Sequence, residues 1–509
     1  MQAPNIESFG NKKLKQAFLI SIVFFIIEFI VVQFHEVWRD EIETWAIGMN
    51  SHSISELFYN GRYEGHPKLW FLMLYTLQFF THNIYYMQVL HVCVATATVF
   101  VFSYFSPFNF VKNILFCFGY FFAYEYSIIS RNYGIEVVLL FLIAGLFLKH
   151  RGKYLILISL LFFLMLQTNL YANIISIVFY PFIIFSLYQS KSLKPLKLII
   201  SILILIPGFI FSIISMIPPD DSGVVLGWKT AYYFPHIISV FSTMIRSYIP
   251  ISAFMHDFWN SSFLDHFRHR DIMEVILIIL LIFSIVVLFY RDKKVLLLFW
   301  AGTIGLLLFT YTKNYGALRH HGHLYLVFVL CLWLCFYEKK DSMGSDKFKS
   351  VFMKRCDLLV RKYFINFLLL IQLFATCRAF ISDIRYPFSN AVAASEYIKA
   401  NSLDTMKLIG DSYPQTVSVA GLLNDEIYCP RSKKWCRYII WDNSRTDTAG
   451  DCVKRETEKL SAQTGSDIIL ILTYPAKDKP GNWKLLKSFE GALIWDENYF
   501  IYRVSPDKM

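Results

Sequence analysis

Long apolar runs constrain the fold of this chain more than any other feature of its sequence. A bilayer hydrocarbon core about 30 Å thick requires roughly 20 apolar residues for each helical crossing. Runs of this kind begin at Ala17, Tyr85, Val111, Gly134, Tyr154, Ala172, Leu198, Ile272, Val295, His321 and Phe364. Only 17% of the 509 residues are charged, whereas about a quarter are charged in a typical soluble domain. We therefore expect a polytopic α-helical membrane protein with about 11 transmembrane helices.

Basic residues give these crossings a direction, because cytoplasmic loops carry an excess of Lys and Arg. The basic clusters are Lys12, Lys13 and Lys15; Lys112; Lys149, Arg151 and Lys153; Lys191, Lys194 and Lys197; Arg291, Lys293 and Lys294; and the stretch Lys339–Lys362. They fall on one side only if the short apolar run Pro67–Phe80 does not cross, so we expect a juxtamembrane or half-inserted helix there. The N-terminus is then cytoplasmic and the C-terminus extracytoplasmic, in the inner (cytoplasmic) membrane. The basic residues behind the +11 net charge lie in short clusters between apolar runs. We therefore expect membrane lipids, and no nucleic acid, as partners.

The composition turns soluble after Ser382, which divides the chain into a transmembrane domain, 1–381, and a small C-terminal α/β domain, 382–509. In the second domain we expect buried strands at Lys407–Asp411 and Asp467–Tyr474, and helices at Ala391–Ala400 and Asp451–Ala462. A Cys429–Cys436 disulfide would be compatible with an oxidising compartment.

The topology collects the polar segments on the outer side of the membrane. These segments are His35–His66, Glu125–Tyr133, Gln167–Tyr171 and Lys313–His320, joined by the long loop Pro218–Asp271. The aromatic residues of that loop favour amphipathic helices on the membrane surface. We therefore expect the outer segments to contribute to one site.

The first outer segment is the richest in charge, with four acids and one Arg within eight residues. Charges next to a membrane helix are costly unless they are hydrated or take part in a functional site. One interpretation is therefore a solvated loop. The other is a catalytic group in which Asp40 is a general base and Glu41 or Glu43 assists it or binds a divalent metal.

A second cluster follows in Arg62–Trp70. The Gly-His-Pro sequence within it indicates a turn into a helix, since Pro fits a first helical turn. A helix start accounts for Gly65 and Pro67 but leaves Glu64 and His66 unexplained.

Together, the Asp40-Glu41 pair and the later Glu-Gly-His-Pro-Lys-Leu-Trp motif at 64–70 resemble the GT-C superfamily of membrane glycosyltransferases. The similarity is to its bacterial glycosyltransferase-39-like group, related to the protein mannosyltransferase and aminoarabinose transferase branches. It extends over about the first 340 residues and is strongest over 35–75. Where that group often has Pro-Pro after the His, this chain has Pro67-Lys68.

The resemblance implies transfer of a sugar from a polyprenyl-phosphate-linked donor to an acceptor hydroxyl of a lipid, glycan or protein. It also implies that Asp40 is the base. The resemblance implies no definite cofactor. The sequence has no clear counterpart of a strict metal-binding triad, so it does not decide whether a divalent metal is required. A donor that carries its own lipid anchor agrees with the lack of a Gly-rich nucleotide-binding motif.

Other outer residues are candidates for donor binding. Glu125, Arg131 and Tyr133 lie near a helix end, and resemble the donor-facing second outer loop of that superfamily. Arg131 suits a phosphate because its guanidinium can bind two oxygens at once. The alternative is that Arg131 binds no ligand and only extends its charged group from the membrane interface towards water.

Arg319, His320 and His321 form a second candidate group for the lipid phosphate. A zinc site there is disfavoured, because the histidine spacing gives no i, i+4 pair on one helical face.

Two other classes of function compete with the transferase. A polar-lipid transporter or flippase predicts charged residues distributed through the helices, whereas here they cluster on one side. A non-catalytic membrane scaffold with a partner-binding C-terminal domain predicts that Asp40→Asn has no effect.

Overall fold

The computed structural model describes residues 6–223, 227–254, 256, 258–338, 359–411, 413–444, 451–477 and 479–506. The chain divides into two compact units. The helical unit comprises Met1–Ile30, Leu90–Ile214 and Leu226–Phe380, and the α/β unit comprises Val31–Val89, Ser215–Val225 and Ile381–Met509. The second unit therefore joins the first outer segment to the C-terminal residues.

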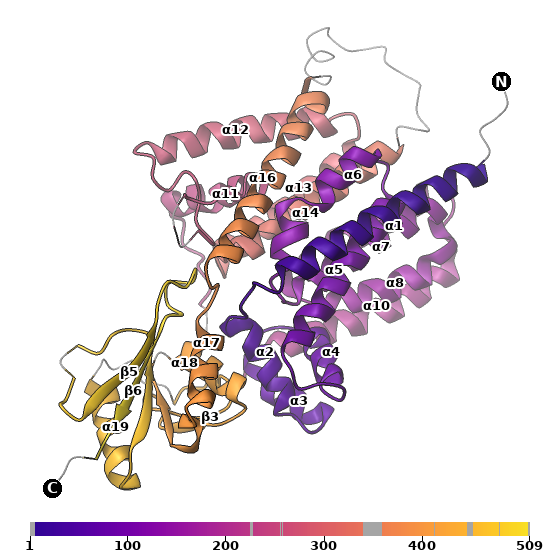
Figure 1. Ribbon diagram of the computed structural model, residues 1–509. Coiled ribbons are helices and arrows are strands. Elements are labelled where there is room, and N and C mark those ends of the chain that lie inside the picture. Colours follow the sequence, from indigo (N-terminus) through magenta and orange to yellow (C-terminus); the bar gives the residue numbers. More distant parts are fainter. Residues whose placement is uncertain are drawn as a thin grey trace. The chain divides into compact units, whose positions relative to one another are not determined.

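The helical unit is built from long apolar helices (Figure 1). Its elements are α1 (Ile6–Val31), α5 (Tyr85–Phe105), α6 (Phe110–Cys117), η2 (Phe121–Glu125), α7 (Tyr133–His150), η3 (Arg151–Tyr154), α8 (Leu155–Leu166), α9 (Leu170–Gln189), α10 (Pro195–Met216), α11 (Phe234–Tyr248), α12 (Arg270–Phe289), α13 (Lys293–Thr312), α14 (Leu318–Glu338), η4 (Val360–Phe364) and α16 (Ile365–Arg385). Within the described residues, 9 segments are long and apolar enough to cross a membrane. The prediction of a multi-pass helical membrane protein is confirmed at this level.

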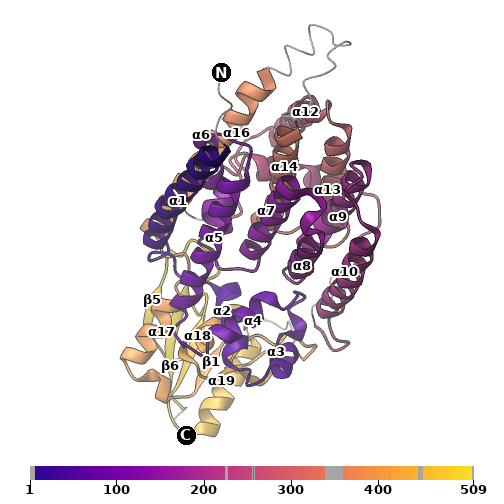
Figure 2. The ribbon, with the colours of Figure 1, turned by 90° about the vertical axis from the view of Figure 1, so that its right-hand side faces the viewer.

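Two of the expected crossings take a different form. The run from Val111 forms α6, which has only 8 residues. The run from Tyr154 forms the 12-residue α8, and one candidate span, Tyr133–Leu166, contains both α7 and α8. These two helices pack against each other (Figure 2). The basic stretch Lys339–Lys362 lies outside the described residues up to residue 358.

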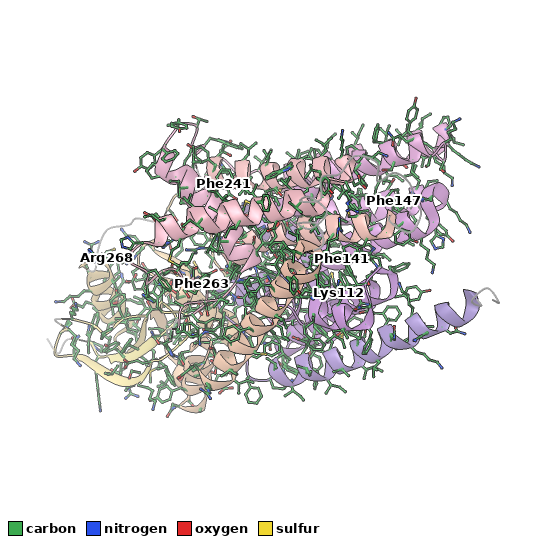
Figure 3. The ribbon with its side chains drawn as sticks, turned by 90° about the horizontal axis from the view of Figure 1, so that it is seen from above. Lys112, Phe141, Phe147, Phe241, Phe263 and Arg268 are labelled. Atoms are coloured by element: carbon green, nitrogen blue, oxygen red, sulfur yellow. The ribbon has the colours of Figure 1, made fainter. Side chains whose placement is uncertain are left out.

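Aromatic rings fill the centre of the helical unit, where α5, α7 and α14 meet. The ring of Phe141 (labelled in Figure 3) lies 5.0 Å from that of Phe102 and 5.3 Å from that of Trp333. Phe102 and Trp333 are buried. By contrast α10 leaves Leu203 and many other apolar side chains exposed, as expected of a surface that faces lipid.

The chain leaves regular helix between α6 and α7, and buried polar side chains satisfy its backbone there. His91 Nδ1 lies 2.7 Å from the carbonyl oxygen of Ser127, and Nε2 lies 2.8 Å from that of Arg131. The hydroxyl of Ser127 donates to Glu28 at 2.8 Å. Non-helical backbone at membrane depth requires such partners. Glu28 and His91, polar residues within apolar runs, therefore support the irregular segment that carries Arg131.

The α/β unit contains one mixed sheet in the order β3-β2-β1-β4-β6-β5. Its elements are α2 (Arg39–Met49), α3 (Ile54–Asn60), η1 (Gly61–Tyr63), α4 (Leu69–Leu77), α17 (Ala391–Ala400), η5 (Leu403–Thr405), β1 (Leu408–Gly410), α18 (Tyr413–Leu423), β2 (Ile427–Cys429), β3 (Lys434–Cys436), α19 (Asp451–Thr464), β4 (Ile468–Leu472), β5 (Trp483–Phe489) and β6 (Tyr499–Val504). Strand β1 is parallel to β2 and β4, while β3, β5 and β6 pair in antiparallel fashion.

Strand β4 is the buried centre of this sheet. Its residues Ile468, Leu470 and Leu472 share a hydrophobic cluster with Val453 of α19. Side chains alternate along a strand, so the intervening residues of β4 point to the opposite face. The two predicted strands appear as β1 and β4, and the two predicted helices as α17 and α19. Ile427, rather than Cys429, pairs with Cys436 across β2 and β3, so the proposed disulfide partners occupy diagonal positions.

The first outer segment packs on the C-terminal residues through α2 and α18. Gly421 of α18 allows this contact, because a Cβ there would lie 2.9 Å from a methyl group of Ile42 and 3.2 Å from Ala46. Helix α4 has 9 residues, too few to span a bilayer, in agreement with the non-spanning helix expected for Pro67–Phe80. In the loop Pro218–Asp271, α11 is a helix of 15 residues.

Candidate functional site

Asp40 lies in the first turn of α2, among acids that the fold engages in different ways. Glu41 is fully buried and accepts one hydrogen bond from the backbone N–H of Trp38 at 3.2 Å. Both oxygens of Glu43 accept from the backbone N–H of Ile439 at 3.0 Å. The Asp40 side chain is 26% exposed, with Arg39 Nε 3.9 Å from its Oδ1. Of the three predicted acids, Asp40 is therefore the one open to solvent.

His35 fixes the chain just before α2. Its Nδ1 lies 2.8 Å from Asp383 Oδ2 and its Nε2 lies 3.2 Å from Glu41 Oε2, and all three side chains are fully buried. Burial alone would lower the pKa of His35, but the two carboxylates outweigh it and raise the pKa to about 10. His35 is therefore an imidazolium at neutral pH, and it orients Glu41 at the start of α2.

Arg39 links the start of α2 to the loop before β6. Its Nη1 donates to Asp496 at 2.8 Å and to Glu497 at 3.4 Å, and its backbone N–H donates to Glu497 at 3.2 Å. Burial raises the pKa of Glu497 to about 7, against the lowering effect of Arg39. Arg39, the residue before Asp40, is thus held by two carboxylates of the C-terminal region, those of Asp496 and Glu497.

The second motif forms the turn before α4. Gly65 has φ +62°, a left-handed conformation that favours glycine. Lys68 is buried and donates to the carbonyl oxygens of Gly61 at 2.6 Å and of His66 at 2.8 Å. Burial lowers the pKa of Lys68 to about 8, although Glu64 opposes this shift. Much of this motif therefore builds the turn, and the half-buried Glu64 and His66 lie on it.

In the helical unit, His320 belongs to a polar and aromatic cluster at the start of α14. The hydroxyl of Tyr133 lies 2.8 Å from His320 Nε2. His323, one turn on, lies 2.8 Å from Glu136 Oε2. The ring of Tyr171 stacks on both histidines, with centroids 5.1 and 4.6 Å away. Of the predicted site residues, His320 and Tyr133 are therefore in direct contact.

Asn169 completes the cluster, since its Nδ2 donates to Glu136 Oε2 at 2.7 Å. The sequence pattern did not indicate Glu136 as a site residue, because it lies inside an apolar run. Its position three residues after Tyr133, on the same helical face, was the available signal.

Arg319 and Glu125 flank the indole of Trp259. The guanidinium carbon of Arg319 lies 5.5 Å from the Trp259 ring centre. The indole N–H donates to Glu125 Oε2 at 3.3 Å, and the Tyr120 hydroxyl donates to the same oxygen at 2.8 Å. A cation over an aromatic face is held in place electrostatically. His321 lies elsewhere, with Nε2 2.9 Å from the carbonyl oxygen of Tyr315.

An apolar groove of about 320 Å³ lies between α11 and α13. Its lining residues are Thr230, Tyr232, Ile237, Val240, Phe241, Ile304, Leu307, Leu308 and Tyr311; Phe241 is labelled in Figure 3. Tyr311 stands one residue before the end of α13, and α14 begins 6 residues after that end. The groove is therefore at the same end of the helices as Lys313 and Arg319.

The predicted site residues thus fall in two groups, one in each compact unit. The α/β unit contains Asp40, Glu41, Glu43, Glu64 and His66, and the helical unit contains Glu125, Arg131, Tyr133, Arg319, His320 and His321. Among the described residues, no group of three or more His, Cys, Asp or Glu side chains is arranged to hold a metal ion. The chain matches no protein-family model and no curated protein.

Proposed function

We propose that the chain is a GT-C-type membrane glycosyltransferase that moves a sugar from a polyprenyl-phosphate-linked donor to an acceptor hydroxyl. The observation that carries this proposal is the state of Asp40, a solvent-accessible carboxylate on a rigid helix start. Its neighbours Glu41 and Glu43 are buried and hydrogen-bonded. A general base needs both access to the acceptor and a fixed position.

In this reaction the acceptor oxygen attacks the anomeric carbon as the bond from that carbon to the phosphate oxygen breaks. The acceptor proton passes to Asp40, and the polyprenyl phosphate leaves with the bonding electrons. Attack from the face opposite the phosphate inverts the anomeric configuration. Glu41, bound to His35, acts as a positioning residue for the helix turn that carries Asp40.

The leaving phosphate needs cations already in place when its charge develops. Arg319, held over Trp259, and His320, held by Tyr133, are the groups we assign to it, with Arg131 as a further phosphate ligand. The apolar groove between α11 and α13 is a candidate place for the first isoprene units of the donor. A groove with few polar atoms suits a hydrocarbon chain.

We further propose the eleven-crossing topology, with a cytoplasmic N-terminus and an extracytoplasmic C-terminal region in the inner membrane. The packing of α7 on α8 supports two crossings within Tyr133–Leu166. The segment Phe110–Glu125, which contains α6 and η2, supplies the remaining one.

The test is to incubate the purified full chain, in nanodiscs, with a panel of polyprenyl-phosphate-linked sugars and to measure release of polyprenyl phosphate with and without a chelator. Release that depends on Asp40 supports the transferase, and loss of release with chelator would add a metal. A folded sample that releases nothing from any donor contradicts it. Transbilayer movement of a donor without release would instead support the flippase, and neither activity would support the scaffold.

A further inference from the structure

A second hollow lies within the α/β unit, away from the acids considered so far. It has a volume of about 490 Å³ and is lined by Gln415, Thr473, Tyr474, Pro475, Glu490, Trp495, Asp496, Asn498 and Phe500. Thr473 follows directly on β4, Gln415 lies in α18 after β1, and Phe500 pairs with the last residue of β4. The cavity therefore opens at the carboxyl edge of the parallel strands β1 and β4, where open α/β sheets bind their ligands.

Aromatic side chains give this cavity an apolar platform. Trp495 is 75% exposed, and Tyr474 is also exposed. An exposed Trp side chain on the wall of a cavity offers a large, rigid and mostly apolar face to a ligand. Its flat apolar face matches the C–H face of a pyranose ring.

Polar groups beside this platform are fixed in position. Asp496 Oδ2 accepts from Arg39 Nη1 at 2.8 Å and from Gln415 Nε2 at 2.6 Å. Asn498 donates to the Trp495 carbonyl oxygen at 3.1 Å and accepts from the Ala492 N–H at 3.1 Å. A carboxylate accepts hydrogen bonds from sugar hydroxyls, and a side-chain amide can both donate to them and accept from them. Such preformed contacts limit the conformational freedom lost on binding.

The charges of the lining select among sugars. Glu490 and Asp496 are acidic, and no Lys, Arg or His is among the lining residues in the described part of the chain. Arg39 pairs with Asp496, so it is the carboxylate of Glu490 that would repel an anionic sugar or a phosphate, whereas an uncharged or amino-bearing sugar would not be repelled. Tyr474 is held in turn by a hydrogen bond to Asp411, which accepts two bonds from Arg431 at 2.7 and 3.1 Å.

We propose that this cavity is a saccharide-binding site for an uncharged or amino-bearing oligosaccharide, with Trp495 as its stacking platform. Arg39 joins the cavity wall at Asp496 to the helix turn that carries Asp40. If the chain is the transferase proposed above, on which this last assignment rests, the bound saccharide belongs to the acceptor.

The experiment measures binding to the full chain in nanodiscs by calorimetry, without any lipid donor. The probes are chitotriose, mannotriose, a trimer of glucosamine and, as the acidic probe, trigalacturonic acid. We expect at least one of the first three to bind with a Kd below about 1 mM, and the acidic probe not to bind. Absence of binding by all three, or equal binding of the acidic probe, overturns the proposal.

Variants assign the binding to the cavity. Trp495→Ala should weaken binding roughly tenfold or more, equivalent to about 1.4 kcal/mol, while Trp495→Phe keeps most of the affinity. The matched control is Trp435→Ala, because Trp435 is also exposed in this unit but does not line the cavity. Equal losses in the two Ala variants, or none in Trp495→Ala, overturn the proposal. Saccharide binding without donor cleavage would contradict the transferase alone, and cleavage without binding would contradict this site alone.

Discussion

His35 Nδ1 lies 2.8 Å from Oδ2 of Asp383, and neither side chain is exposed to solvent. One residue follows the first apolar helix, and the other lies near the end of α16. The second nitrogen of His35 faces Glu41 at 3.2 Å. One buried cation therefore joins the start of α2 to the segment that leads into the C-terminal sheet.

Removal of this cation should destabilise the α/β unit. His35→Ala leaves Asp383 and Glu41 buried without their counter-charge, and the loss of one partner of a buried ion pair costs about 3–5 kcal/mol. We expect a clear fall in the thermal unfolding temperature in detergent. His52→Ala is the control, since His52 is exposed in the same unit. Equal unfolding temperatures for the two variants would contradict the assignment.

Stability should also fall as the pH rises. The pKa of His35 is raised to about 10 in the folded state, above its value of about 6.5 in an unfolded chain. The folded state therefore binds more protons between these values, so this contribution is complete below pH 6.5 and is lost as the pH passes 10. Unfolding temperatures from pH 6 to 10 should fall more steeply in the wild type than in His35→Gln. Parallel curves would exclude His35 as the cause.

Patterns local in the sequence predicted much of the fold. The apolar runs gave the long helices, and α17 has the predicted bounds Ala391–Ala400. The run from Val111 does not form the single long helix expected, because composition does not reveal that α6 ends at Cys117 and that an irregular segment follows. Strands β2 and β3 have three residues each, too few to show an alternating pattern.

The candidate site was only partly predictable, because its contacts join distant segments. The sequence could place Asp40 in the first outer segment, next to a membrane helix. It could not show that Glu43 accepts a hydrogen bond from the N–H of Ile439, or that Asp496 accepts one from the guanidinium of Arg39. Which carboxylate becomes buried and which stays accessible depends on the packing of α2 against α18, and no local pattern records that packing.

Asp40→Asn should abolish most turnover while leaving the protein folded. The amide keeps the shape of the side chain but cannot accept the acceptor's proton, and general base catalysis contributes about 10²–10⁴-fold. The measurement is the rate of polyprenyl phosphate release at saturating donor. Glu426→Gln is the control, because Glu426 is an exposed acid of the same unit. Wild-type turnover in Asp40→Asn would refute the base assignment.

Arg319→Ala should slow the chemical step more than it weakens donor binding. A preorganised charge on the leaving group acts mainly in the transition state, and its loss lowers kcat by about 10²–10³-fold. Arg319→Lys should restore part of the rate because it keeps a positive charge. The exposed Arg268 (labelled in Figure 3) supplies the control Arg268→Ala. A variant with raised KM and unchanged kcat would give Arg319 a binding role only.

Reporter fusions should locate the loops on the two sides of the membrane. Green fluorescent protein matures in the cytoplasm and alkaline phosphatase becomes active outside it. Fusions after Lys112 and after Lys153 should therefore fluoresce, and a fusion after Pro506 should show phosphatase activity.

The Lys153 fusion carries the most information, because Lys153 lies between α7 and α8. If Tyr133–Leu166 crosses once, this position lies within the bilayer; if α7 and α8 cross separately, it is cytoplasmic. Phosphatase activity after Lys112 would contradict the proposed topology, because either Pro67–Phe80 would then also cross the membrane or the whole orientation would be reversed.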